Sequence, residues 1–166
     1  MAQSGFLVVD ANVLVDYQAA DLEILALVNR YVGSVHILTT ILVEVEGLDE
    51  ADCERLGFRV VEPTFAQVAE AASAAGRLSF PDRTCLLVCR DRGWKCVSND
   101  RALRKACESD GIAVIWGLGL MLELVRDGHL RAEDASAAAE RIHLANPVYV
   151  NSTILAAFRR KLAGRG

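Results

Sequence analysis

Four acidic residues occupy positions from which their carboxylates could act together. They are Asp10 after the apolar run 6–9, Glu44 after the run 35–38, Asp82 at the start of an apolar helical pattern, and Asp100 after the run 94–98. Crowded carboxylates repel one another unless a cation neutralises them, and hard divalent cations prefer oxygen ligands. Such a cation can activate water and stabilise a phosphate under in-line attack, so the chemistry indicated is phosphodiester hydrolysis.

Each acid also has a purely structural interpretation. Asp10, Asp82 and Asp100 each precede or begin a helical pattern, where aspartate is a good N-cap. Glu44 and Glu46 could simply be exposed on a helix. The metal hypothesis therefore depends on whether the fold brings these positions to one crevice.

The elements that would do so alternate along the chain. Residues 6–9 are continuously apolar and rich in valine, which is typical of a strand buried on both faces in a parallel sheet. Further strands are predicted at 35–38, 58–62, 94–98 and 112–116. Helices are predicted at 11–18, 21–33, 39–47, 64–76, from the turn 78–82 to about 93, at 101–106, 118–125 and 132–142, with a last one beginning at Asn151 or Ser152. Alternation of this kind predicts a parallel sheet covered by helices on both faces, with ligands bound at the carboxyl ends of the strands.

Composition sets wider limits. The 166 residues are 52% hydrophobic and 24% charged, which is typical of one globular domain. A net charge of -4 argues against binding nucleic acid through bulk positive charge, although a bound divalent cation could supply positive charge at the site. The N-terminus lacks the pattern of a signal peptide and no apolar run could span a bilayer, so we expect a cytoplasmic protein.

Five cysteines occur without a CxxC pair. Cys85 and Cys89 are spaced one helical turn apart in an apolar segment, so reduced core thiols are expected rather than a zinc site or a disulfide framework.

Several of these motifs together resemble those of a known family, the PIN-domain ribonucleases. The resemblance rests on Val8-Val-Asp-Ala-Asn-Val-Leu14, on Val43-Glu44 with Glu46-Gly47, on Phe80-Pro-Asp82, and on Cys96-Val-Ser-Asn-Asp-Arg-Ala-Leu103, and it spans roughly residues 6–127. It departs from the family at Ala11, where threonine or serine is usual. The predicted single PIN-like domain, 1–166, also has a helical C-terminal extension at about 130–166.

The resemblance implies a three-layer α/β/α sandwich around a central, mostly parallel five-stranded sheet. It implies Mg²⁺- or Mn²⁺-dependent endoribonuclease activity, a homodimer, and a toxin role with a cognate antitoxin that covers the acidic pocket. Asp10, Glu44, Asp82 and Asp100 match the acidic positions, with Glu46 as the alternative second acid, and Asn12 and Ser98 match the supporting polar residues.

Other side chains could contact RNA. Arg101, Arg104 and Lys105 recur at helical spacing after Asp100, and Arg83 follows Asp82, so each could bind phosphate, although a solvated helix face also explains them. Both tryptophans, Trp94 and Trp116, are expected in the core rather than as stacking platforms. The three scattered histidines do not indicate a metal-free ribonuclease.

In the predicted mechanism Asp10, Asp82 and Asp100 hold the metal directly or through water, and Glu44 orients the attacking water. Two alternatives stay open. A haloacid-dehalogenase-type phosphatase would need a second aspartate where Asn12 stands. A non-catalytic PIN-fold module that binds protein or RNA would not need the acids at all.

Overall fold

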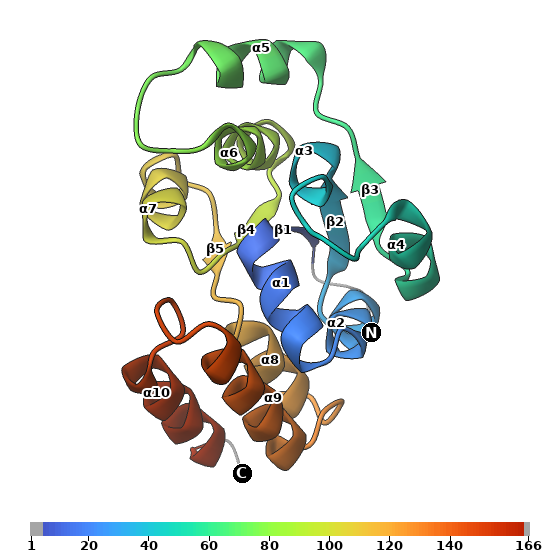
Figure 1. The fold of residues 1–166 in the computed structure, drawn as a ribbon, viewed down its shortest axis with the longest axis vertical. Coiled ribbons are helices and arrows are strands. Elements are labelled where there is room, and N and C mark those ends of the chain that lie inside the picture. Colours follow the sequence, from blue (N-terminus) through green and yellow to red (C-terminus); the bar gives the residue numbers. More distant parts are fainter. Residues whose placement is uncertain (1–4, 165–166) are drawn as a thin grey trace.

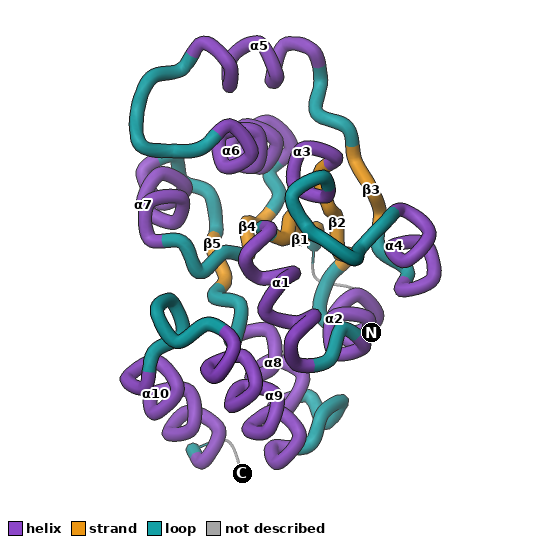
Figure 2. Tube along the Cα trace, in the orientation of Figure 1, coloured by secondary structure: helices purple, strands orange, loops and turns teal. Residues whose placement is uncertain are grey.

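The buried strand β1, Phe6–Val9, lies at the centre of the molecule. The computed structural model describes residues 5–164, and within them the strands form one five-stranded sheet in the order β3-β2-β1-β4-β5 (Figures 1 and 2). Every pair of neighbouring strands is parallel. Leu7, Val8 and Val9 are almost fully buried, which confirms the central strand that their composition predicts.

The other strands are β2 Ser34–Leu38, β3 Arg59–Val61, β4 Lys95–Val97 and β5 Val114–Ile115. Strand β2 begins one residue earlier than predicted, whereas β3, β4 and β5 are each shorter than predicted. In the register, Leu7 lies opposite Val35 on one side and Lys95 on the other. The order reverses at β1, since β2 and β3 extend to one side and β4 and β5 to the other. Right-handed crossovers then place the helices of the two halves on opposite faces, as the predicted α/β sandwich requires.

Ten helices lie within residues 5–164. They are α1 Ala11–Ala20, α2 Glu23–Tyr31, α3 Thr39–Leu42, α4 Glu50–Leu56, α5 Phe65–Ser73, α6 Phe80–Arg92, α7 Arg101–Ser109, α8 Gly119–Arg126, α9 Ala132–Ala145 and α10 Ser152–Ala163. None of them combines the length and apolar composition that a bilayer crossing requires.

Two helix predictions were wrong. The helix starting at Thr39 ends at Leu42, and residues 43–47 form turns. The whole of α4 was missed, although Asp49 and Asp52 form a capping box at its start and Gly57 ends it in the left-handed conformation at φ 82°. A capping box with aspartate as its second member is a weak sequence signal, since glutamate or glutamine is usual there.

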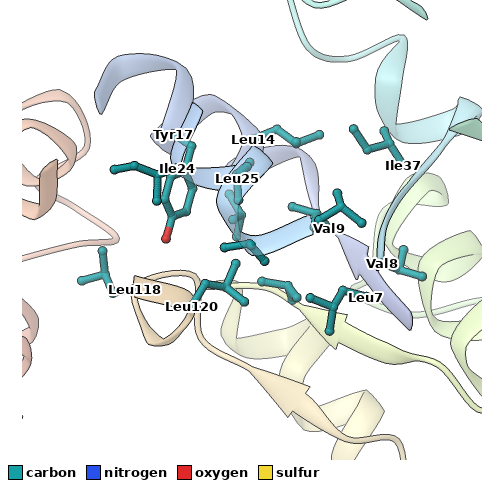
Figure 3. Packing of buried hydrophobic residues seen from close by; sticks show 14 of the residues in the cluster. Leu7, Val8, Val9, Leu14, Tyr17, Ile24, Leu25, Ile37, Leu118 and Leu120 are labelled. Carbon is teal, nitrogen blue, oxygen red and sulfur yellow. The ribbon is translucent and has the colours of Figure 1, made fainter. Parts of the chain in front are cut away.

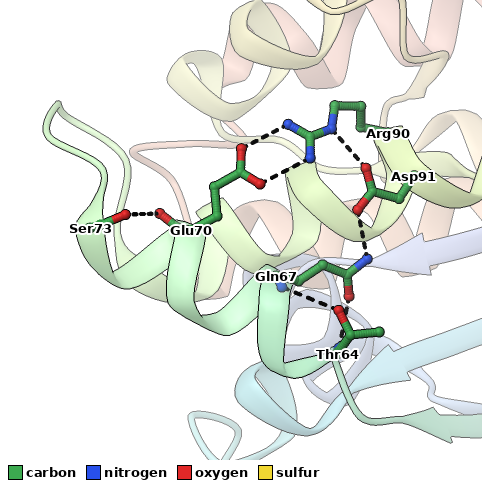
Figure 4. Close-up of polar contacts among 6 residues, drawn as sticks. All are labelled: Thr64, Gln67, Glu70, Ser73, Arg90 and Asp91. Carbon is green, nitrogen blue, oxygen red and sulfur yellow. Dashed lines mark hydrogen bonds and ion pairs between the residues drawn. The ribbon is translucent and has the colours of Figure 1, made fainter.

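Helix α5 is joined to α6 mainly by polar contacts (Figure 4). The predicted capping box of Thr64 and Gln67 is present, and the Gln67 amide also donates to Asp91 on α6 at 3.0 Å. Arg90 on α6 donates two hydrogen bonds to the Glu70 carboxylate, at 3.0 and 3.1 Å. These contacts hold α5 against the carboxyl-terminal end of α6.

The hydrophobic core extends from the sheet into α1, α2 and α8 (Figure 3). Leu14 and Tyr17 of α1 pack with Leu25 of α2 and Leu120 of α8, and all four are at most 1% exposed. All five cysteines are free and buried, which confirms the prediction of reduced core thiols.

Helix α9 packs against α1 through small side chains. Ala135, Ala138 and Ala139 are fully buried, while Ala137 on the opposite face is exposed. Helix α10 lies along α9 and α8 (Figure 1), and its Leu155, Phe158 and Leu162 are buried, so the C-terminal extension is part of the core. Alanine permits a close approach between helices that a larger side chain would prevent.

Ala138→Leu is therefore expected to lower the free energy of unfolding by about 1–3 kcal/mol, because the added atoms overfill the packing around the buried face of α9. Urea unfolding followed by circular dichroism measures the change. Ala137→Leu, on the exposed face of the same helix, should shift stability by no more than about 0.5 kcal/mol. Equal losses in the two variants would show that α9 is not packed through its buried face.

Candidate active site

The site lies where the order of the strands reverses. Asp10 follows β1, while Ser98, Asn99 and Asp100 follow β4, the adjacent strand. The two strand ends are linked directly, because the backbone N–H of Asp10 donates to the Val97 carbonyl at 3.0 Å. In an open α/β sheet this reversal leaves the crevice in which ligands bind.

Asp10 is 3% exposed and both of its carboxylate oxygens are held. Oδ1 accepts a hydrogen bond from the Ala11 N–H at 2.7 Å, and Oδ2 accepts one from the Ser98 hydroxyl at 2.8 Å. The Ser98 oxygen itself accepts from the Asp100 N–H at 3.0 Å. Asp10 thus caps α1, as its structural interpretation predicts, and through Ser98 it is linked to the start of α7.

Asp82 and Asp100 lie at the starts of the two helices on the opposite face. Asp82 is in the first turn of α6, where its N–H donates to the Ser79 hydroxyl at 3.2 Å. Asp100 caps α7 by accepting from the Leu103 N–H at 2.8 Å. Each carboxylate stands at a helix N-terminus, where the helix dipole favours negative charge.

The three aspartates are close enough to repel one another. Burial raises the pKa of Asp10 to about 6, repulsion by Asp82 and Asp100 adds to this rise, and the bonds from Ser98 and Ala11 oppose it. Burial also raises the pKa of Asp82, with a further contribution from Asp100. Such a group of partly buried acids lacks the positive charge that would keep them all ionised.

Glu44 is placed differently. It lies exposed on the turn that follows α3, as does Glu46. Among the described residues, no three carboxylates bring their oxygens within 4.8 Å of one another. Asp10, Asp82 and Asp100 are therefore near enough to affect one another's pKa, whereas Glu44 lies on the exposed surface. Asn12, predicted as a supporting residue, is exposed in the first turn of α1, whereas Ser98 contacts Asp10 directly.

The donor set fits Mg²⁺ or Mn²⁺. Both ions select carboxylate oxygens, and Mg²⁺ retains several waters while contacting only one or two carboxylates. If the carboxylates lie too far apart for all of them to contact the ion directly, some can bind it through water. Asp10, Asp82 and Asp100 are the residues that could hold such an ion.

A group of thiols lies in the core behind these acids. The sulfurs of Cys85, Cys89 and Cys96 lie within 4.8 Å of one another, with 3.7 Å between those of Cys85 and Cys96. All three are fully buried. The hydrogen bond with Cys89, and after it burial, raises the pKa of the Cys85 thiol well above its ordinary value, so without a metal this thiol stays protonated.

A second buried acid, Asp16 on α1, was not predicted from the sequence. It is 3% exposed. Its carboxylate accepts from the Asn99 amide at 3.1 Å and from the Asn146 amide at 2.9 Å. Asn99 in turn accepts from the Gly117 N–H at 2.9 Å, and the Tyr17 hydroxyl donates to the Gly117 carbonyl at 2.6 Å. The sequence signal that could have identified Asp16 is its position in the helical pattern, where an apolar residue is expected.

This network connects the loop that contains Asp100 to the C-terminal extension. Asn99 directly precedes Asp100, and Asn146 directly follows α9. Desolvation raises the pKa of Asp16, and the two amide bonds oppose that rise. Asp16 therefore holds the loop that contains Asp100 rather than taking part in the acidic group.

Of the cations predicted to bind phosphate, some are exposed and others are held by contacts within the protein. Arg101 and Lys105 are exposed on α7 and available to a ligand. Arg83 donates to the carbonyls of Ala71 and Gly76, at 3.1 and 3.4 Å, and so holds the segment between α5 and α6. Arg104 lies over the ring of Trp116, with its Cζ 3.2 Å from the ring centroid.

The tryptophans also differ from each other. Trp94 is half-buried and contacts Phe6 and His36, in line with a core role. The prediction for Trp116 was wrong, because its side chain is 44% exposed. Strand β5 ends at Ile115, so Trp116 already belongs to the turn beyond the sheet.

The raised pKa of Asp10 predicts how stability depends on pH without metal. The unfolded chain releases this proton near 3.8 and the folded protein only near 6, so stability should fall as pH rises between these values. The loss amounts to about 3 kcal/mol at most, and Asp82 adds to it with the same sign. Urea unfolding in EDTA measures it, and Asp10→Asn should flatten the profile. An identical profile in that variant would contradict the prediction.

Comparison with known proteins identifies the fold. No protein-family model matches this chain, and no curated protein matches it in sequence. A solved structure is similar, that of the PilT N-terminus domain protein SSO1118 from the hyperthermophilic archaeon Sulfolobus solfataricus P2. The TM-score is 0.53 at 14% sequence identity, over 71% of this chain and 92% of the archaeal chain. The parallel five-stranded α/β fold described above is thus similar to that of a PilT N-terminus, or PIN, domain protein.

Proposed function

We propose that this protein is a metal-dependent endoribonuclease. The observation that supports it best is the group of three mutually repelling aspartates at the strand reversal of a PIN-like fold, with Asp10 buried and oriented by Ser98. The fold supports a nuclease in general, and the choice of RNA rests on the sequence resemblance.

In this proposal the residues divide the work. Asp10, Asp82 and Asp100 hold one or two Mg²⁺ or Mn²⁺ ions, and the Ser98 hydroxyl keeps Asp10 oriented. When bound, the ion would lower the pKa of a water and offset charge on the phosphate. Glu44, at the exposed rim, would orient the attacking water, with Glu46 as the alternative. Arg101 and Lys105 would contact neighbouring phosphates of the RNA.

Attack by water, rather than by the ribose 2′-hydroxyl, gives products with a 5′-phosphate and a 3′-hydroxyl. The proposal also includes a toxin role in the cytoplasm, with a cognate antitoxin that covers the acidic pocket, and a homodimer. The toxin role, the antitoxin and the homodimer rest on the sequence resemblance alone, and the cytoplasmic location rests on the composition of the chain.

The test is cleavage of a pool of structured RNAs by purified protein with Mg²⁺, with Mn²⁺ or with EDTA. We expect cleavage only with metal, and products that a ligase requiring a 5′-phosphate will join. Cleavage in EDTA, or products ending in a 2′,3′-cyclic phosphate, would contradict the proposal. Binding of RNA without turnover under any metal would favour the non-catalytic module instead.

A further inference from the structure

A cleft of about 410 Å³ separates the end of the sheet from the last helix. One wall comes from β5, the turn after it and α8, and the other from α10 and the segment before it. Its lining includes Asn99, Trp116, Leu122, Tyr149, Phe158 and Lys161. A concave, mostly apolar space with a few polar groups at its edges is the usual form of a ligand site.

The cleft adjoins the acidic group. Asn99, in its lining, stands between Ser98 and Asp100, and Trp116 follows the neighbouring strand β5 at the same edge of the sheet. The amide of Asn99 is occupied by Asp16 and Gly117, so this residue forms a fixed part of the wall. A chain bound across the aspartates could therefore reach the cleft without leaving the carboxyl edge.

Two aromatic side chains are exposed around this cleft. Trp116 is 44% exposed and Tyr149 is 53% exposed, although burial of such large rings would favour folding. One comes from the sheet edge and the other from the segment between α9 and α10. Exposed rings of this kind are the platforms on which unpaired bases stack in proteins that bind single strands.

Positive charge accompanies the rings. The Arg104 guanidinium covers Trp116, and within residues 5–164 its buried Nε has no hydrogen-bond partner. Lys161 lines the cleft as well. Glu123, the acid in the lining, is paired with Arg126 at 2.5 Å, so its charge is already offset. Among the charged residues of the lining, Lys161 is therefore the one without an ion-pair partner within residues 5–164, and its charge suits a phosphate; Arg104 lies outside the lining, against Trp116.

We propose that this cleft binds an unpaired nucleotide of a single-stranded RNA, with the base stacked on Trp116 and Tyr149 and the phosphate facing Arg104 and Lys161. The inference rests on the proposed function and extends it, since it assigns the C-terminal extension to substrate binding and selects single-stranded over duplex RNA. An apolar peptide would fill the same space without using the guanidinium or the lysine. A duplex cannot offer a free base to the rings.

The experiment measures binding without catalysis. Fluorescence anisotropy of a short labelled single-stranded RNA of mixed sequence is recorded in EDTA, alongside the same RNA as a duplex. The variants are Trp116→Ala and Tyr149→Ala, with Phe65→Ala as matched control. Phe65 is an aromatic residue 89% exposed on α5, at the opposite end of the molecule (Figure 1). Circular dichroism checks that each variant is folded.

We expect each cleft variant to weaken binding of the single strand about tenfold or more, and Phe65→Ala to leave it unchanged. Equal binding by all four proteins, or tighter binding of the duplex, would overturn the cleft proposal. The proposal would also be overturned if a labelled apolar peptide, and not RNA, bound the protein in a way that depends on Trp116 and Tyr149. The readout is independent of metal. Cleft-dependent binding without cleavage would refute only the nuclease, and cleavage without cleft dependence would refute only the cleft.

Discussion

Asp10→Asn is expected to reduce metal-dependent RNA cleavage on the order of a thousandfold or more. The substitution removes the charge of the carboxylate at the centre of the acidic group, and charge stabilisation by a bound metal is worth several kcal/mol. The asparagine oxygen can still accept from the Ala11 N–H, so α1 keeps its cap. Initial rates of cleavage with saturating Mg²⁺ or Mn²⁺ measure the loss.

The same variant should be more stable than the wild-type protein in EDTA above about pH 6, because it no longer ionises a buried carboxyl. Metal should raise the midpoint of thermal unfolding in the wild type more than in Asp10→Asn. Asp110→Asn, at the exposed end of α7, serves as the control and should cleave normally. If Asp10→Asn keeps full activity, Asp10 has no part in the mechanism. If the variant is instead less stable than the wild type, its loss of activity is explained by misfolding.

Asp16→Ala is expected to destabilise the protein by about 2–5 kcal/mol, because it leaves two partly buried amides without their acceptor. The Asn99 and Asn146 amides would lose their acceptor inside the protein, and each unsatisfied buried group adds about 1–3 kcal/mol. Urea unfolding at neutral pH measures the change.

Two comparisons separate this network from general effects. Asp134→Ala removes a surface ion pair with Arg131 and should cost no more than about 1 kcal/mol. Asn146→Ala removes only the bond from the C-terminal extension and should fall between the two. A loss below about 1 kcal/mol in Asp16→Ala would show that the network does not hold the loop of Asp100 in place.

The strand β1 and the acid that follows it were predictable from local sequence. A run of leucine and valine that ends at Asp10 is buried on both faces in whatever parallel sheet it joins, so its central place followed from hydrophobicity alone. The capping box of Thr64 and Gln67 and the glycine after α6 are likewise local, because their hydrogen bonds join residues within one or two turns. Helix α4 was missed since it starts with a less common pair of capping residues.

Other features depended on contacts between distant segments. The 4-residue helix α3 stopped before Glu44, which left that acid on an exposed turn although its position after a strand matched the motif. Trp116 reads as a strand residue, yet β5 ends one residue earlier and its ring is exposed under Arg104. Asp16 and Asn146 are 130 residues apart, so their hydrogen bond could not be inferred from either segment.

By itself the sequence determined the alternation of strands and helices, the central strand, and the acids Asp10, Asp82 and Asp100 at the ends of elements, because hydrophobic periodicity and capping act over a few residues. The tertiary structure alone decided which acids repel one another, which cations stay free for a ligand, and that the C-terminal extension leaves a cleft beside them. Those properties depend on burial and distance, which arise only when segments far apart in the chain pack together.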